Sequence, residues 1–213
     1  MNVIIFGPPG AGKGTQAQNI VNKFNLYQIS TGDLLRNEIK SKTNVGDEID
    51  KTISYGDFVS DEIIQKLLKN VITDPSNRNR IIFDGYPRNI SQAKSLEKLF
   101  KDDNQSIHSV FFLNVTRENI EKRILGRVVC DKCNKTLNEL LNKDELEKHA
   151  CGTKFLKKRK DDNKEVMINR YDEYIKKTKP VLNFYSARSY FHEIDGNQKI
   201  QVITNKIEQI LNV

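Results

Sequence analysis

The sequence predicts an α/β fold in which a parallel β-sheet is flanked by helices. Residues 2–6, 80–85 and 110–113 each contain a short apolar run of three or four residues, and such runs are typical of strands buried on both faces. Helical stretches separate them. In residues 61–72, apolar side chains share one helical face, and we assign the cap of this helix to Asp61. The alternation of strand and helix favours a parallel sheet.

Other elements carry weaker signals. We expect a helix over residues 13–24, a short strand near 27–29 and a further strand at 200–203. Residues from about 30 to 60 contain no strong strand, and 128–160 mix Cys, Lys and Asn without a sheet pattern. Both of these segments are expected to be insertions on the core.

The composition is that of a globular chain. Of its 213 residues, 37% are hydrophobic and 30% are charged, and no apolar run approaches the ~20 residues of a membrane span. The apolar run after Met1 has no basic segment before it and is soon interrupted by glycine and prolines, which argues against a signal peptide. We therefore expect a cytoplasmic protein without a membrane partner. A monomer is expected because no apolar surface stripe is evident.

The net charge of +7 fits anionic partners, but it does not distinguish nucleotides from nucleic acid. A nucleic-acid partner is not expected, because no basic helix interleaved with aromatic residues is evident in the sequence.

A phosphate-binding loop is the strongest local signal. Residues 7–15 read Gly-Pro-Pro-Gly-Ala-Gly-Lys-Gly-Thr and lie between a predicted strand and a predicted helix, the context that such a loop requires. Glycines let backbone N–H groups turn towards an oxyanion, and the helix N-terminus adds a favourable dipole. Lys13 is expected to reach the β- and γ-phosphates, and Thr15 to point its hydroxyl towards Mg²⁺. Gly14 stands where the general pattern has Ser or Thr.

This loop resembles the variant found in adenylate kinases, and three further blocks match that family in the same order. They are residues 29–36 (Ile-Ser-Thr-Gly-Asp-Leu-Leu-Arg), residues 83–88 (Phe-Asp-Gly-Tyr-Pro-Arg) with Gln92, and residues 159–162 (Arg-Lys-Asp-Asp) with Arg170. The similarity runs from the first residue to the closing helix and is to the bacterial form with a long lid. It implies an enzyme that moves the terminal phosphoryl group of Mg-ATP onto AMP to give two ADP.

The resemblance also implies a division of the chain. The core nucleotide-binding domain would comprise residues 1–29, 60–126 and 163–213. Residues 30–59 would form a mobile, helical AMP-binding insertion, and residues 127–162 a long lid.

The resemblance assigns the AMP site as well. Arg88 would hold the AMP phosphate, and Gln92 would read the edge of the adenine. A guanidinium suits the first task because it grips a phosphate bidentately and keeps its charge. The full AMP-binding set is Thr31, Arg36, Asp57, Phe58, Val59, Gly85, Tyr86, Pro87, Arg88, Gln92, Arg159 and Arg170.

On the ATP side, Arg123 and Arg127 lie four residues apart and are expected on one helical face. The resemblance implies that Arg123 stacks on the adenine and Arg127 contacts the phosphates, with Gln198 near the base. The full ATP-binding set is Gly10, Ala11, Gly12, Lys13, Gly14, Thr15, Arg123, Arg127 and Gln198.

Catalysis is assigned to positive charge, because phosphoryl transfer needs positioning and charge neutralisation more than covalent chemistry. No general base is required, since the AMP phosphate is already an anion. Asp161 and Asp162 are expected to pair with arginines or with the other insertion, rather than to act as a base. The catalytic set is Lys13, Arg88, Arg127, Arg159 and Arg170, with Arg36 beside it.

Asp84 ends an apolar strand, which places its carboxylate at the carboxyl edge of the sheet, where ligands bind in open α/β folds. Asp84 and Thr15 are expected to hold Mg²⁺ indirectly, since this ion keeps several of its waters. The alternative is that Asp84 only forms a turn.

Cys130 and Cys133 form a C-x-x-C pair, and with Cys151 they resemble the lid of relatives that carry a structural zinc. A closed zinc site needs four ligands, and the family's fourth position falls here on Lys154, which cannot serve. His149 is the candidate fourth ligand. The weaker candidates are Asp144, Glu145 and Glu147. The alternative is a lid with three free thiols. A disulfide framework is not expected, because the number of cysteines is odd and the expected compartment is reducing.

Two other functions remain open from the sequence. A kinase of UMP, CMP or GMP would share the loop and the arginines, and the base-side residues Thr31 and Gln92 are the discriminators. A phosphate-loop protein that only hydrolyses or senses a nucleotide is the other alternative. The second anion site implied by Arg36 and Arg88 argues against it.

Overall fold

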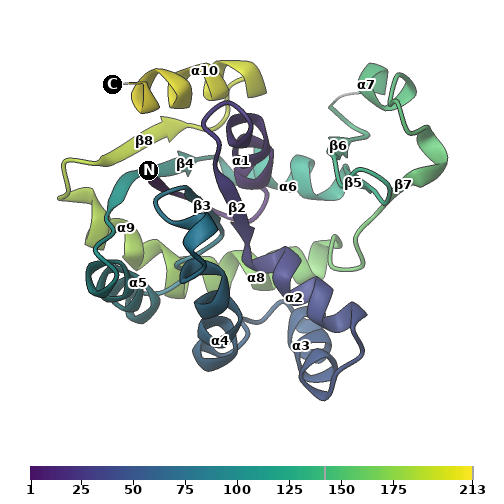
Figure 1. Cartoon of the computed structure of the whole chain (residues 1–213). Helices are drawn as coiled ribbons and strands as arrows, with labels where there is room; N and C mark the ends of the chain where they lie inside the picture. Colours follow the sequence, from purple (N-terminus) through teal and green to yellow (C-terminus); the bar gives the residue numbers. More distant parts are fainter. Residues whose placement is uncertain (142, 213) are drawn as a thin grey trace.

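The computed structural model describes residues 1–141 and 143–212. At its centre lies a five-stranded parallel sheet in the order β2-β3-β1-β4-β8, with helices on both faces (Figure 1). The predicted fold class is therefore confirmed. The strands of this sheet are β1 (Asn2–Phe6), β2 (Tyr27–Ser30), β3 (Ile81–Asp84), β4 (Ile107–Asn114) and β8 (Phe191–Asp195).

Two hydrophobic cores lie on opposite faces of the sheet, because successive side chains of a strand point to opposite sides. In β1, Val3 and Ile5 face one core, and Ile4 and Phe6 face the other. The helices that cover the Val3 face are α1 (Lys13–Val21), α6 (Arg117–Leu125) and α10 (Ile200–Leu211). Those that cover the Ile4 face are α4 (Asp61–Ile72), α5 (Ile90–Asp102) and α9 (Lys179–Ser186).

The register of the strands brings their carboxyl ends to one edge. Asp84, the last residue of β3, pairs with Ile5 of β1 on one side and with Ser30 of β2 on the other. The loop after β1, the start of α2 (Thr31–Lys40) and Asp84 therefore meet at this edge.

Two helices follow β2 and pack against each other: α2 and α3 (Asn44–Tyr55). The Thr43 hydroxyl caps α3 by accepting a hydrogen bond from the Gly46 N–H at 3.0 Å. A Cβ at Gly46 would lie 2.6 Å from the Glu38 carbonyl oxygen, so glycine permits the close approach of the two helices. Figure 1 shows the pair projecting from the sheet.

A small antiparallel sheet in the order β6-β5-β7 occupies the 127–157 region. This small sheet was not predicted from the sequence. Its strands are two to four residues long, which is too short for an alternating pattern to be recognised. The elements here are β5 (Arg127–Cys130), β6 (Thr136–Asn138), α7 (Lys143–Glu147), η2 (Thr153–Phe155) and β7 (Leu156–Lys157).

Residues 200–203, expected to be a strand, form the first turn of α10 instead. The burial of Ile203, Ile207 and Leu211 at four-residue spacing shows the helical period. The missing strand is β8, whose sequence Phe-His-Glu-Ile-Asp is polar because it lies at the edge of the sheet and pairs only with β4.

The cap of α4 also differs from the expectation. The Ser60 hydroxyl accepts the hydrogen bond from the Ile63 N–H, and Asp61 is the first helical residue. Serine is a strong N-cap, and an acidic residue in the first turn is favoured by the helix dipole, so each position carries a suitable side chain.

A long helical segment closes the core. It runs from α8 (Lys164–Glu173) through a π-helical turn, η3 (Tyr174–Thr178), into α9. The Thr178 hydroxyl donates to the Arg88 carbonyl at 2.8 Å, which anchors the segment after β3. A single 3₁₀ turn, η1 (Pro75–Asn77), precedes β3.

We expect Ile4→Ala to lower the free energy of unfolding by about 2–5 kcal/mol, because Ile4 is fully buried in the central strand and the change leaves a cavity. Val202→Ala is the control, since this side chain is 50% exposed, and we expect a change within about 0.5 kcal/mol. Chemical denaturation measures both. Equal effects would contradict the assignment of β1 to the core.

Candidate active site

The phosphate-loop residues connect β1 to α1 at the carboxyl edge of the sheet. Gly10 and Gly12 have φ values of +76° and +94°, a region that favours glycine. A Cβ at Gly10 would also lie 2.8 Å from Cγ1 of Ile124, so α6 approaches the loop closely. The Lys13 ammonium donates to the carbonyls of Gly7 and Pro8 at 3.0 and 2.9 Å. The Lys13 side chain therefore folds back over the phosphate loop.

The structure explains the departure of the loop from the general pattern at Gly14. A Cβ at this position would lie 2.9 Å from Oδ2 of Asp84. Glycine therefore lets the carboxylate at the end of β3 approach the start of α1. Thr15 follows in the same first turn of α1.

Burial and charge shift the pKa values of Lys13 and Asp84. Burial lowers the pKa of Lys13 to about 8, against the raising effect of the Asp84 carboxylate, and Arg88 and Arg170 lower it further. Burial raises the pKa of Asp84, while Lys13 opposes this shift. The pair is therefore a buried ammonium and carboxylate in a region of excess positive charge.

Two arginines pair with the consecutive aspartates Asp161 and Asp162. Nε and Nη2 of Arg127 donate to the two carboxylate oxygens of Asp162, with an Nε–O distance of 2.7 Å. Nη1 of Arg170 donates to Asp161 at 2.6 Å. Burial opposes the charge on Arg127, but its bond to Asp162 and the charge of that carboxylate raise the pKa of this arginine. The expected pairing is confirmed.

The pKa values of Arg88 and Arg159, unlike that of Arg127, are lowered. Burial lowers the pKa of Arg88 to about 10, and the charge of Arg170 adds to this shift. Burial likewise lowers the pKa of Arg159 to about 10, with Arg127 and Arg36 adding to it. These guanidiniums lie where a further anion would be strongly stabilised.

Most of the predicted AMP-site residues line two adjoining hollows. The first is bounded by Thr31, Leu35, Phe58, Val59, Ile64, Gly85, Tyr86, Arg88 and Gln92. The second is bounded by Gly32, Leu35, Arg36, Ile53, Gly56, Asp57, Phe58, Val59, Arg88, Asp161 and Arg170. Arg88 lines both hollows, and its guanidinium lies over the Phe58 ring at 5.1 Å. Pro87 is buried and bounds neither hollow.

Arg123 lies on the other side of the phosphate loop. Its guanidinium donates to the Ala11 carbonyl at 3.1 Å and to the Gly196 carbonyl at 2.7 Å. Gln198 is exposed nearby and donates to Asp195 at 2.8 Å. The expectation that Arg123 and Arg127 share a helical face was wrong, because α6 ends at Leu125 and Arg127 is the first residue of β5.

Two residues of the site were not assigned to the nucleotide site from the sequence. Asp33 forms an ion pair with Arg36 three residues later in α2, and a carboxylate in the first turn of a helix was the available signal. Asp61 accepts hydrogen bonds from Asn89 and Gln92, which a sequence pattern cannot show because the two helices are distant in the chain.

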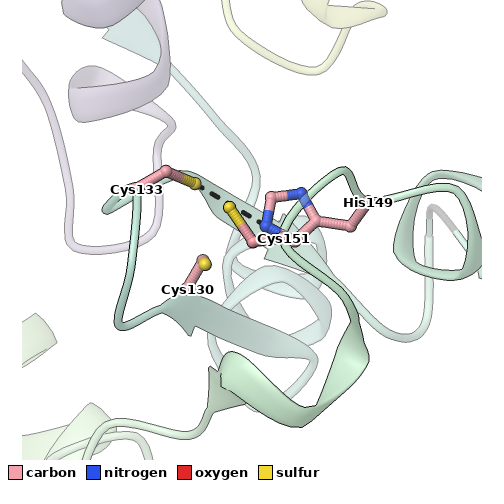
Figure 2. A group of neighbouring side chains, drawn as sticks. All are labelled: Cys130, Cys133, His149 and Cys151. Atoms are coloured by element: carbon pink, nitrogen blue, oxygen red, sulfur yellow. Dashed lines mark hydrogen bonds between the residues drawn. The ribbon is translucent and has the colours of Figure 1, made fainter.

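The cysteines gather with a histidine at the far end of the small sheet. Figure 2 shows Cys130, Cys133, His149 and Cys151 facing a common point. Their four ligand atoms lie within 4.8 Å of one another, and Nε2 of His149 is 3.6 Å from Sγ of Cys133. Three sulfurs and an imidazole nitrogen are the donors that a closed, tetrahedral zinc site uses.

The thiols of this cluster do not ionise alike. Burial opposes the ionisation of Cys130, but hydrogen bonds from His149 and from the backbone of Cys133 and Lys132 lower its pKa to about 6. Burial and its hydrogen bonds to the neighbouring thiols raise the pKa of Cys151 to about 11. The donor set therefore fits a cation that stabilises several thiolates together, whereas without a cation the neighbouring sulfurs disfavour the ionisation of Cys151.

The sheet with a phosphate loop at its carboxyl edge defines the chain as a nucleotide-binding α/β protein. Comparison with known proteins then gives the family. The profile described as "Adenylate kinase" matches residues 5–190. The chain is 61% identical to the adenylate kinase of Pelagibacter ubique, over all of both chains. It is 37% identical to that of Zymomonas mobilis, covering 99% of this chain and 96% of the relative. It is 36% identical to that of Listeria innocua, covering 99% of each.

The chain therefore belongs to the adenylate kinase family, as its motifs predicted.

We expect the protein purified without chelator to contain about one zinc per chain, because four sulfur and nitrogen donors converge. Cys151→Ser should lose this metal and lower the melting temperature. His192→Ala, which changes a histidine outside the cluster, should keep it. Elemental analysis and thermal unfolding measure these effects. Wild-type protein without metal would show that the lid holds free thiols.

Proposed function

We propose that the residues gathered at the carboxyl edge of the sheet carry out the reaction of the adenylate kinase family. That reaction is the reversible transfer of the terminal phosphoryl group of Mg-ATP to AMP, giving two ADP, and the family assignment confirms it as the predicted activity. The observation that supports the residue assignment is the position of Arg88. It lines both hollows, and its charge acts on Lys13 of the phosphate loop, which supports an acceptor site beside the donor phosphates.

On the donor side, the backbone N–H groups of residues 10–15 would surround the ATP phosphates, and Lys13 would leave its loop carbonyls to reach them. Arg123, held between the Ala11 and Gly196 carbonyls, would lie against the adenine. Gln198 would lie nearby, at the edge of the base.

On the acceptor side, the first hollow would hold the adenine against Phe58 and Val59, with Gln92 reading its edge. Arg88 and Arg36 would bind the AMP phosphate. An oxygen of this phosphate forms a bond to the γ-phosphorus of ATP as the bond from that phosphorus to the β-phosphate oxygen breaks, and ADP leaves. Arg127, Arg159 and Arg170 would neutralise the charge that spreads over the transferring group.

Adenylate kinases use Mg²⁺, and the donors of this chain fit that ion. Asp84 presents a carboxylate oxygen over Gly14, where any larger residue would fill the space, and hard cations such as Mg²⁺ prefer oxygen ligands. Asp84 and the Thr15 hydroxyl would hold the ion through water. The bound ion would neutralise phosphate charge.

We further propose that residues 30–59 and 127–162 close over the nucleotides, with 1–29, 60–126 and 163–213 as the core. Closure would exclude water, which would otherwise accept the phosphoryl group. Asp161 and Asp162 would hold Arg170 and Arg127 in place until phosphates arrive.

For the remaining partners, we propose a cytoplasmic monomer that binds neither nucleic acid nor membranes. Among residues 1–141 and 143–212, no helix has the length and apolar character needed to cross a membrane.

The test of this function is ADP formation from Mg-ATP with AMP, CMP, UMP or GMP as acceptor. We expect strong activity with AMP, lost without Mg²⁺ and reduced at least about a hundredfold by Lys13→Met, because this change removes the positive charge that Lys13 would place beside the transferring phosphoryl group. Lys23→Met is the matched control, since Lys23 lies in an exposed ion pair with Glu208. A preference for CMP, UMP or GMP would show that the acceptor is a nucleotide other than AMP. ATP hydrolysis without transfer would contradict the acceptor site.

We also expect ATP affinity to fall as pH rises above about 8, because the pKa of Lys13 is lowered to about 8 and its neutral form cannot pair with phosphate. Below that pH the ammonium is already charged. Above it, binding must take up a proton, so the dissociation constant should rise by up to about tenfold per pH unit. Lys13→Arg, whose guanidinium stays charged, should bind ATP without this pH dependence. Calorimetry measures both, and a flat wild-type profile would exclude Lys13 as the group responsible.

A further inference from the structure

Asp61 ties the beginnings of two helices together. It is the first residue of α4, directly after the 30–59 segment. Asn89 caps α5 by accepting a hydrogen bond from the Gln92 N–H at 2.8 Å, and its amide nitrogen donates to both Asp61 oxygens at 3.0 and 3.1 Å. The Asp61 carboxylate is thus held by contacts from α5.

The same carboxylate fixes the orientation of the Gln92 side chain. Nε2 of Gln92 donates to Oδ1 of Asp61 at 2.6 Å, and Oε1 accepts from the Arg88 backbone N–H at 2.7 Å. A carboxylate can only accept and a backbone N–H can only donate, so a single orientation of the carboxamide satisfies both. The flipped orientation would place oxygen against oxygen and N–H against N–H. Gln92 is 3% exposed, so water could not compensate.

This orientation decides what Gln92 can offer to a base. Its oxygen keeps one lone pair and its nitrogen keeps one N–H, and the residue lines the first hollow. Adenine carries a donor at its 6-amino group and an acceptor at N1. Hypoxanthine and guanine carry the reverse, an acceptor at O6 and a donor at N1. For a base held in one position, the fixed carboxamide matches one pattern and the flipped carboxamide matches the other.

We propose that Asp61 is a positioning residue that sets the preference for a 6-amino over a 6-oxo purine by preventing the carboxamide of Gln92 from flipping. The inference rests on the proposed function, in which Gln92 reads the acceptor base. Asp61 itself does not touch the base. It acts through Gln92, and the Arg88 N–H acts with it.

Asp61→Asn tests this, because an amide at position 61 can donate or accept and no longer distinguishes the two orientations of Gln92. With AMP and IMP as acceptors at saturating Mg-ATP, we expect the preference in kcat/KM for AMP to fall by about tenfold, chiefly through a higher KM for AMP. The KM for ATP should not change. Asp61→Glu, which keeps an acceptor of the same charge, should retain part of the preference.

Glu62→Gln is the matched control: it neutralises an exposed carboxylate in the same helical turn, and the preference should stay at the wild-type value. Gln92→Ala distinguishes a failure of the proposed base pocket from a failure of the proposed role of Asp61. If it leaves the KM for AMP unchanged, the proposed base pocket is wrong. If it raises that KM while Asp61→Asn leaves the preference intact, the pocket stands and the role of Asp61 is overturned.

A second test needs no variant and so does not depend on the folding of Asp61→Asn. A crystal structure of the wild-type protein with AMP should place Nε2 of Gln92 within hydrogen-bonding distance of both Asp61 and the adenine. A Gln92 side chain turned away from Asp61 in that complex would overturn the proposal.

Discussion

The structure depends on the crowding of positive charge around one buried carboxylate. The charges of Asp84, Arg88 and Arg170 all act on the pKa of Lys13, and those of Arg170 and Asp84 act on the pKa of Arg88. Burial and mutual repulsion lower the pKa of Lys13 to about 8 and that of Arg88 to about 10, so the chain alone holds charge that one aspartate does not balance. Two nucleotides carry the negative charge that would complete the balance. The excess positive charge at this edge of the sheet would therefore be neutralised by the phosphates of bound nucleotides.

Segments outside the central sheet supply carboxylates that pair with the arginines of the site. Asp161 and Asp162 offer carboxylates to Arg170 and Arg127, and Asp33 offers one to Arg36. These contacts hold the guanidiniums in position, so little reorganisation is needed when a phosphate replaces the carboxylates. The cluster of three cysteines and one histidine lies in the same segment as the two consecutive aspartates, at the small sheet of β5, β6 and β7. A metal there would stiffen the small sheet that presents these aspartates.

Much of this could be predicted from the sequence, because the strongest signals are local. The strands at 2–6 and 81–84 each contain an uninterrupted apolar run, at 3–6 and 81–83, and the phosphate loop is a contiguous motif. The elements and contacts that were wrongly predicted or missed have physical reasons. Residues 200–203 are as apolar as a strand, but only the burial of Ile207 and Leu211 further along reveals the helix. The edge strand β8 is polar because it has one neighbour, and the pairing of Asp61 with Gln92 joins helices whose contact no local pattern encodes.

In the proposed function, the acceptor hollows adjoin the phosphate loop, so that both nucleotides bind in one continuous site. A single molecule with two adenosines joined through their phosphate chains tests it most directly, by calorimetric titration of the wild-type protein. We expect one such molecule to bind per chain, at least about a hundredfold more tightly than ATP or AMP alone, and to exclude both nucleotides. Binding no tighter than that of ATP, with AMP still able to bind beside it, would contradict the claim.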